Sequence, residues 1–268
     1  MLAFKILLKE VFHLIRHKNG RRFLWLAFRK GGKQRFKAQK LNFAGFKLQV
    51  TDCLSFIWQV KEIFVDEAYR FQSSSAQPVI YDCGANIGTS ALYFKHLYPE
   101  AKVTAFEADE KIAAVLKTNL ATNQLADVTV IAKAVWINNE GIEIATDGAD
   151  GASMYGNSQK ISIPSVRLKD LLAQETHIDM LKMDIEGAEV DVMLDCAKVL
   201  DKVQHLFVEY HAYQGQPQQL SKLLAVLEKN QFRYFIRDDQ DRKSPLVNKR
   251  FRNNSPMDLR LNIFAYKS

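Results

Sequence analysis

The chain has 268 residues, of which 47% are hydrophobic. This is enough apolar material for one large α/β domain with an attached segment, which argues against disorder of the whole chain. The three cysteines are widely spaced and form no CxxC pair. Their spacing argues against a disulfide framework or a zinc site and predicts a reducing, cytoplasmic compartment.

The chain has a net charge of +7, and its excess of basic residues lies at the N-terminal end. Residues 1–40 hold twelve Lys and Arg against one acidic residue, a net charge of +11, whereas residues 41–268 have a net charge of −4. This asymmetry argues against a nucleic-acid surface along the whole chain. It predicts a local contact with an acidic partner or with an anionic membrane face.

Residues 4–16 form the first predicted element, an amphipathic basic helix, because their apolar residues recur at helical spacing. Lys5 and Lys9 interrupt the apolar run, which argues against a membrane span or a signal peptide. A second apolar run at 23–28 lies between two pairs of basic residues. Two interpretations stay open: peripheral contact with the inner membrane face or a lipid-linked substrate, or packing on the domain or a second subunit.

The remaining chain predicts a domain over residues 43–268, with residues 1–42 as a basic helical extension. Residues 43–71 predict a hairpin and a helix. A short strand at 79–82 then runs into a glycine-containing turn, and strand and helix patterns alternate from there with short links, as in a parallel sheet. We expect further strands at 103–107, 128–135, 180–184, 205–209, 232–236 and 261–266, and helices at 89–97, 110–119, 168–174, 188–196 and 218–230.

Two stretches depart from this alternation. Residues 142–144 and 161–163 predict a strand pair around the polar loop 147–159, a candidate lid or substrate loop. The last two strands leave no room for a crossover helix between them. They therefore predict an antiparallel pair at the end of the sheet.

The turn after the first strand of the domain, Asp82 to Gly88, predicts a ligand site. Glycine allows a close approach to the backbone, and the N–H groups at a helix start favour an anionic or polar group. The turn lacks the full GxGxxG and the Gly-Lys-Ser/Thr of phosphate loops, so alone it could be only a tight connection. Glu107 ends the next strand about 20 residues on, where a carboxylate can bind both ribose hydroxyls. Together they predict a nucleoside ligand.

Two further acids end later strands of the predicted sheet. Asp184 follows one strand and Glu209 the next, so both should reach the carboxyl edge, where ligands bind in open α/β folds. Each acid taken singly could be a helix cap or a solvated strand end. For Glu186 and Glu189 a favourable interaction with a helix dipole is a competing interpretation.

Four segments, DCGANIG, AFEAD, DMLKMDIEGAE and FVEYH, occur in the order and spacing of FkbM family methyltransferases. The chain resembles that family over roughly residues 78–212. The resemblance implies a doubly wound, seven-stranded, Rossmann-like α/β sheet with the antiparallel ending that distinguishes methyltransferases from dehydrogenases. It also implies S-adenosylmethionine as cofactor. The cofactor contacts it implies are Asp82, Gly84, Ala85, Asn86, Gly88, Thr89 and Glu107, with Lys133-Ala134 near adenine. Arg167 and Lys169 depart from the pattern, since the family often has Thr and Asp there.

Methyl transfer to an oxygen needs a base that removes the hydroxyl proton. His211 is the candidate, oriented by Glu209 or Asp184, although a lone histidine at a strand end is more often structural. The acids and His211 could instead bind a divalent cation that acidifies the hydroxyl, an alternative that we do not prefer.

We expect O-methylation of a hydroxyl, on a sugar of a glycan or of a glycosylated metabolite. A noncatalytic nucleoside-binding or glycan-assembly scaffold is the alternative from another class. The incomplete glycine fingerprint disfavours a nicotinamide-dependent oxidoreductase. A nucleic-acid methyltransferase is disfavoured because the domain is net acidic and lacks an Asn/Asp-Pro-Pro-aromatic motif.

Overall fold

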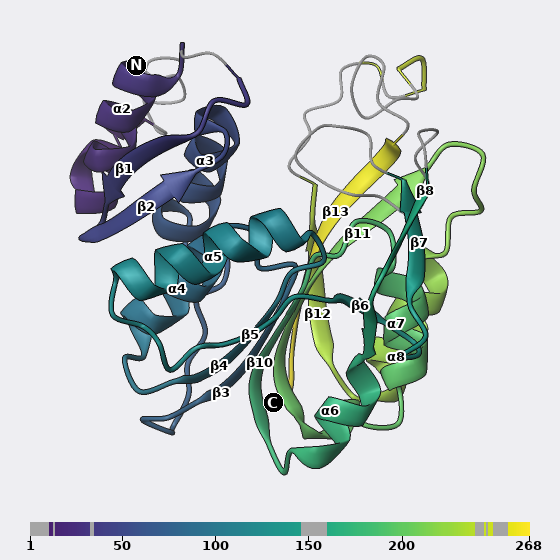
Figure 1. Ribbon diagram of the computed structural model, residues 1–268. Helices are drawn as coiled ribbons and strands as arrows, with labels where there is room; N and C mark the ends of the chain where they lie inside the picture. The colour runs from purple at the N-terminus through teal and green to yellow at the C-terminus, as the bar shows by residue number, and fades with distance from the viewer. Residues whose placement is uncertain are drawn as a thin grey trace.

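A seven-stranded sheet forms the centre of the molecule in the computed structural model (Figure 1). The structure describes residues 11–12, 14–32, 35–145, 160–238, 244, 246–248 and 257–268. The strand order is β12-β13-β11-β10-β3-β4-β5. The bounds are β3 Val79–Cys83, β4 Lys102–Phe106, β5 Thr129–Ile131, β10 Ile178–Met183, β11 Val203–Tyr213, β12 Arg233–Arg237 and β13 Met257–Tyr266. The predicted doubly wound α/β fold with seven strands is confirmed.

The central strands are parallel and buried. Every residue of β10 is buried, as expected for an apolar strand covered on both faces. It pairs in parallel with β3 on one side and β11 on the other. β13 is antiparallel to both β11 and β12, which confirms the predicted antiparallel ending. Because β3 and β10 are parallel neighbours, the glycine turn that follows β3 lies beside the end of β10.

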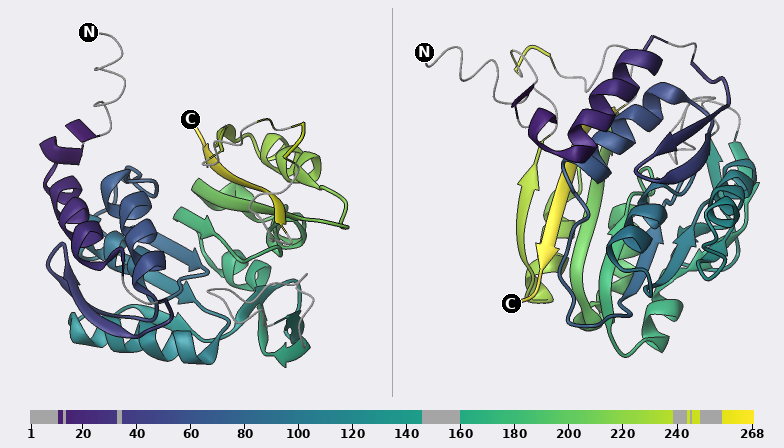
Figure 2. Two further views of the ribbon diagram at one scale, coloured as in Figure 1. Left: turned by 90° about the horizontal axis from the view of Figure 1, so that it is seen from above. Right: turned by 90° about the vertical axis from the view of Figure 1, so that its left-hand side faces the viewer.

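Helices cover both faces of the sheet (Figures 1 and 2). α4 (Thr89–Leu97) and α5 (Glu110–Thr122) pack into one hydrophobic cluster with β3 and β4, whereas α6 (Leu168–Gln174), α7 (Glu189–Cys196) and α8 (Leu220–Lys229) belong to a second cluster. Alternate residues of a strand point to opposite faces. Accordingly, Ile80 of β3 lies in the first cluster and Tyr81 in the second.

The predicted strand 128–135 is wrong as a single element. The chain turns between Ile131 and Ala134, where the Lys133 N–H donates to the Ile131 carbonyl at 3.0 Å. It thereby leaves the sheet after β5 and forms β6 (Ala134–Trp136), which pairs with β9 (Ser165–Arg167). The expected strand pair is present as β7 (Ile142–Ala145) and β8 (Lys160–Ile163), but the candidate lid at 147–159 lies outside the described residues.

A hairpin and two helices cover the edge of the first cluster. β1 (Gln39–Phe43) and β2 (Phe46–Val50) form the hairpin, which confirms that expectation, and β1 runs across residue 42, where we divided the chain. α3 (Cys53–Val60) follows and continues directly as a π-helix, η1 (Lys61–Val65). π-Helical turns occur often at functional sites.

α2 (Lys18–Lys30) packs against α3 and η1 at the outer edge of the molecule (Figure 2). Its Phe23 and Leu26 are buried in the same cluster as Phe64 of η1. Residues 11–12 and 14–16 are also helical, while the start of the helix predicted at 4–16 lies outside the described residues. The second apolar run thus packs one face on the domain.

Candidate functional site

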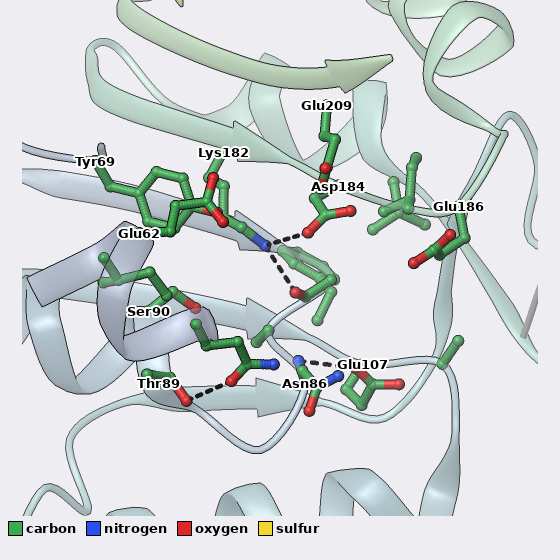
Figure 3. A pocket seen from close by; sticks show the side chains of 18 of the residues that line it. Glu62, Tyr69, Asn86, Thr89, Ser90, Glu107, Lys182, Asp184, Glu186 and Glu209 are labelled. Carbon is green, nitrogen blue, oxygen red and sulfur yellow. Dashed lines mark hydrogen bonds and ion pairs between the residues drawn. The ribbon is translucent and has the colours of Figure 1, made fainter. Parts of the chain in front are cut away.

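A cleft of about 800 Å³ opens at the carboxyl edge of the parallel strands, where α/β folds bind their ligands. The ends of β3, β4, β10 and β11 form its floor, and α3 with η1 forms one side. Figure 3 shows Asn86 and Glu107 in its lower part and Asp184 and Glu209 in its upper part. Eight of the eleven predicted site residues line this cleft: Gly84, Ala85, Asn86, Thr89, Glu107, Ala134, Asp184 and Glu209.

The turn after β3 owes its shape to three residues with left-handed backbone. Gly84, Asn86 and Gly88 have φ values of +81°, +49° and +95°. A Cβ atom on Gly84 would lie 1.8 Å from the carbonyl oxygen of Asp184, so only glycine fits there. The N–H groups of Gly84 and Ala85 donate to the Phe106 carbonyl at 3.0 and 2.8 Å. The turn is therefore fixed against both neighbouring strands.

Glu107 lies at the end of β4 with its carboxylate held by the turn. Its Oε2 accepts from the Asn86 N–H and its Oε1 from the Asp109 N–H, each at 2.9 Å. Burial raises the pKa of Glu107 to about 7, although these two hydrogen bonds act in the opposite direction. A carboxylate in this position has further lone pairs for the hydroxyls of a ribose, and Lys133 and Ala134 lie beside it in the cleft wall.

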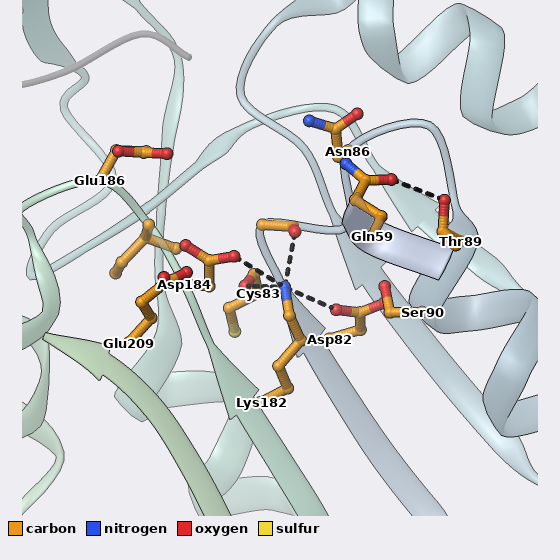
Figure 4. Close-up of polar contacts among 12 residues, drawn as sticks. Gln59, Asp82, Cys83, Asn86, Thr89, Ser90, Lys182, Asp184, Glu186 and Glu209 are labelled. Atoms are coloured by element: carbon orange, nitrogen blue, oxygen red, sulfur yellow. Dashed lines mark hydrogen bonds and ion pairs between the residues drawn. The ribbon is translucent and has the colours of Figure 1, made fainter. Parts of the chain in front are cut away.

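Lys182 is a site residue that the sequence reasoning missed. Its Nζ donates to the Gly84 carbonyl at 2.7 Å and lies 3.4 Å from Asp82 Oδ1 and 3.7 Å from Asp184 Oδ2 (Figure 4). Burial lowers the pKa of Lys182, but the two carboxylates outweigh burial and raise it. The signal in the sequence was a single charged residue within an otherwise apolar strand, Met180 to Met183.

Asp82 and Gly88, two of the predicted cofactor contacts, lie behind the cleft wall. Asp82 is fully buried, and its Oδ2 accepts from the Ser90 hydroxyl at 2.6 Å. In this position it holds Lys182 and α4 rather than facing the cleft. Gly88 begins α4, and a Cβ atom there would lie 2.6 Å from the Leu116 side chain. Their direct contact with a cofactor stays a prediction.

The pKa values of the two carboxylates at the upper end of the cleft, Asp184 and Glu209, shift in opposite directions. Burial would raise the pKa of Asp184, but the charges of Lys182 and His211 hold it below its ordinary value. Burial and the neighbouring Asp184 raise the pKa of Glu209 well above its ordinary value, although Arg260 lies 2.9 Å away. Of the two, Asp184 is therefore the one whose surroundings favour the ionised form.

His211, the predicted base, is buried beside the cleft and is not part of its lining. Its Nδ1 lies 3.0 Å from Glu189 Oε1 and its Nε2 3.7 Å from Glu186 Oε2. Burial lowers the pKa of His211, but these carboxylates outweigh burial and raise it well above 6.5. The two carboxylates therefore favour the protonated form of the ring, and the role of His211 as the base stays a prediction.

Asp184, Glu186 and His211 offer ligand atoms within 4.8 Å of one another, the spacing of a metal site. A metal ligand must supply a free lone pair, and the carboxylates beside His211 favour its protonated ring, which has none. Since both ring nitrogens of His211 lie close to carboxylates, the arrangement fits an ion-paired cluster better than a divalent cation.

The side of the cleft formed by α3 and η1 was not predicted. Trp58 is 60% exposed and lines the cleft, as does Glu62 of η1. Gln59 accepts a hydrogen bond from the Thr89 hydroxyl at 2.8 Å, which ties α3 to the start of α4. These residues lie in a stretch where the sequence shows only a mixed hydrophobic pattern. No local motif indicated that it would reach the strand ends.

Comparison with known proteins identifies the family. Residues 82–234, more than half of the chain, match the model of the methyltransferase FkbM domain. The chain belongs to this family. The matched segment contains the glycine turn, Glu107, Lys182 and the carboxylates of the cleft, so the FkbM domain supplies both ends of the site.

Three curated relatives also match about half of the chain or more. The chain is 30% identical over 170 residues to methyltransferase sdnD of Sordaria araneosa, a match that covers 50% of this chain and 66% of that protein. It is 28% identical to the 2-O-methyltransferase NoeI of Sinorhizobium fredii, covering 52% and 67%. It is 24% identical to the hexuronic acid methyltransferase AglP of Haloferax volcanii, covering 63% and 72%. The matches thus span about two thirds of the first two relatives' own length.

The two departures from the FkbM pattern lie away from the cleft. Arg167 donates from Nε and Nη2 to the two carboxylate oxygens of Asp195, at 2.8 and 2.6 Å. Lys169 lies 3.8 Å from the same carboxylate. Asp195 belongs to α7, so this pairing fastens β9 and α6 to the neighbouring helix. In this FkbM domain the two basic residues have a structural partner.

Proposed function

We propose that the protein is an S-adenosylmethionine-dependent O-methyltransferase that acts on a sugar hydroxyl. One observation carries the proposal: the glycine turn with Glu107 and the carboxylate of Asp184 line opposite ends of one cleft. The family relationship supports methyl transfer, and the cleft supplies a place for both donor and acceptor.

The residues of the lower end fit the cofactor. Gly84 and Ala85 expose backbone to the cleft, and Glu107 offers carboxylate oxygens to a ribose. Ala134 leaves room beside Glu107 for a flat base. Bound there, S-adenosylmethionine supplies a methyl group that is already activated toward a nucleophile.

The upper end then has to orient the acceptor and take up its proton. We assign proton acceptance to Asp184 in place of His211, because Asp184 lines the cleft, whereas His211 is buried behind the lining with a carboxylate beside each ring nitrogen. Lys182 and His211 position Asp184 and keep it ionised. Glu209, which pairs with Arg260 at 2.9 Å and also lines the cleft, is placed to hydrogen-bond the acceptor.

The composition of the open part of the cleft supports a sugar as the acceptor. Trp58 presents an exposed aromatic side chain, on which the C–H face of a sugar ring can pack. Carboxylates and arginines that line the same cleft can bind sugar hydroxyls. The names of two relatives support the same class, since one is a 2-O-methyltransferase and the other acts on a hexuronic acid. An O-linked methyl group on a sugar is the product we expect.

Asp184→Asn is the test. The protein is incubated with S-adenosylmethionine and a panel of glycans and glycosylated metabolites, and formation of S-adenosylhomocysteine and of methylated sugar is followed by mass spectrometry. Loss of a general base should lower turnover by about 10²–10⁴-fold, with cofactor affinity by calorimetry nearly unchanged. Glu186→Gln is the matched control, a neighbouring carboxylate that should cost far less.

Two results would contradict the proposal. Full turnover of Asp184→Asn together with lost turnover of a folded His211→Ala variant would return the base role to His211. Cofactor binding without turnover on any acceptor would favour the noncatalytic scaffold.

A further inference from the structure

α2 has two apolar faces, and only one of them is packed. Gly20, Phe23 and Leu26 are buried against the domain. On the opposite face, at helical spacing, Trp25 is 58% exposed and Phe28 is 91% exposed. Packing on the domain therefore accounts for the inner face of α2 and leaves the outer aromatic pair unexplained.

Cations accompany these exposed aromatic rings. The guanidinium of Arg29 lies 4.7 Å from the centre of the Trp25 ring, and that of Arg16 lies 5.4 Å from the centre of the Phe12 ring, which is itself 60% exposed. Lys18 and Arg21 are exposed on α2 as well. We call Lys18, Arg21, Trp25, Phe28 and Arg29, which share the outer face of α2 at helical spacing, the aromatic–basic patch.

The stretch of chain that carries the patch is basic. Residues 11–40 contain ten Lys and Arg and no acidic residue. Contact between two copies through this patch would bring the two sets of cations together, which disfavours a second copy of the chain as the occupant. An anionic surface is complementary to it.

We propose that the aromatic–basic patch docks the protein on an anionic lipid surface. Trp and Phe beside Arg and Lys are typical of interfacial helices, whose rings enter the boundary between headgroups and acyl chains while the cations meet anionic headgroups. No helix among the described residues has the length and apolar content needed to cross a bilayer. The contact is peripheral, made by the outer face of a helix whose inner face stays packed.

Docking in this way also orients the cleft. α2 packs against α3, and α3 carries Trp58 in the cleft wall. The patch and the cleft therefore belong to one packed unit, and attachment through α2 fixes the distance of the cleft from the lipid surface.

The experiment is flotation of the full chain with phosphatidylcholine vesicles, with and without phosphatidylglycerol. We expect flotation only with the anionic vesicles, and its loss in molar salt, where the Debye length falls to about 3 Å. The double variant Trp25→Ser/Phe28→Ser should bind at least about tenfold more weakly, because the buried apolar area is lost. Its circular dichroism should match that of the wild type, since both side chains are exposed.

Leu246→Ser/Val247→Ser is the matched control. Leu246 and Val247 are 91% and 78% exposed and lie outside the patch, so this variant should float like the wild type. Three outcomes overturn the proposal: failure of the wild type to float with anionic vesicles at low salt, undiminished flotation of the Trp25/Phe28 variant, or tighter binding to RNA than to vesicles with the same dependence on the patch.

Discussion

The two ends of the cleft are built in different ways. The lower end comes from one continuous stretch, in which β3, its glycine turn and β4 bring Gly84, Asn86 and Glu107 together within about 25 residues of chain. The upper end combines η1, β10, β11 and β13, and the Asn262 side chain donates to Glu62 Oε1 at 3.2 Å across 200 residues of sequence. A local arrangement can be predicted from a motif, whereas the upper end depends on the whole fold.

The largest effect is expected at the buried ion pair of the upper end. His211→Ala should lower the free energy of unfolding by about 3–5 kcal/mol, because it leaves the fully buried Glu189 carboxylate without its cation. Since folding raises the pKa of His211, the stabilisation is complete below pH 6.5, its ordinary value, and is lost as the pH rises through the folded value. Urea denaturation at several pH values measures both.

Two variants sharpen this prediction. His205→Ala on the same strand removes a ring that packs against Phe71 and whose Nδ1 lies 2.9 Å from the Asp179 carbonyl, but it leaves no buried carboxylate without a cation, so we expect a smaller loss of about 1–2 kcal/mol. Adding Glu189→Gln to His211→Ala removes the orphaned charge and should restore part of the stability. A single His211→Ala variant as stable as the wild type would show that the pair is not structural.

The contrast between the two ends explains what the sequence could and could not predict. Glu107 was predictable because one strand and one turn fix its place, and Asp184 and Glu209 because parallel strands end at one edge. Lys182 was overlooked because no local motif marks it. Its partner Asp82 lies in β3, about 100 residues away, and only the strand order makes them neighbours.

Two further features, the break between β5 and β6 and the surroundings of His211, could not be predicted because they also depend on contacts between residues distant in sequence. The break between β5 and β6 depends on Ala134 pairing with Ser165 of β9, a contact that no local periodicity encodes. The raised pKa of His211 depends on Glu189, the first residue of α7, whose carboxylate lies 3.0 Å from the His211 ring on β11. Hydrophobic spacing predicted the helix at 188–196, but it could not predict which acidic residue near the helix start would contact the imidazole of His211.

Gly84→Ala probes the contact between the two ends. We expect a loss of about 3 kcal/mol or more in the free energy of unfolding, because left-handed backbone disfavours a Cβ atom and this one would lie 1.8 Å from the Asp184 carbonyl oxygen. Thermal and urea denaturation measure the change, and cofactor binding should fail with it.

Gly215→Ala separates strain from collision. Gly215 has φ +80°, nearly that of Gly84, but nothing lies within 4 Å of its added Cβ atom. Gly215→Ala should therefore lower the free energy of unfolding only by the cost of placing alanine in left-handed backbone, about 1–2 kcal/mol. Equal losses of stability in the two variants would mean that β3 and β10 move apart to make room for the added Cβ atom. The close approach of Gly84 to the Asp184 carbonyl would then not be what fixes the turn.

The smallest effect concerns the charge of Glu107 at the lower end. Burial raises its pKa to about 7 in the free protein, and ribose hydroxyls donate best to the ionised form. Cofactor binding therefore favours loss of the proton, so affinity for S-adenosylmethionine should rise with pH up to about 7 and level off above it. Glu107→Gln should bind about tenfold more weakly above pH 7 and lose this pH dependence.

Calorimetry between about pH 5.5 and pH 7.5 tests this prediction, a range centred near the shifted pKa rather than the ordinary value of a glutamate. Glu110→Gln is the control, since it removes an exposed carboxylate at the start of α5 and leaves Glu107 in place. It should follow the wild-type curve. If the Glu107→Gln variant kept the full pH dependence, the titrating group would have to lie at the upper end of the cleft, where Glu186 also has a raised pKa. The same curve repeated on Glu186→Gln would then identify it.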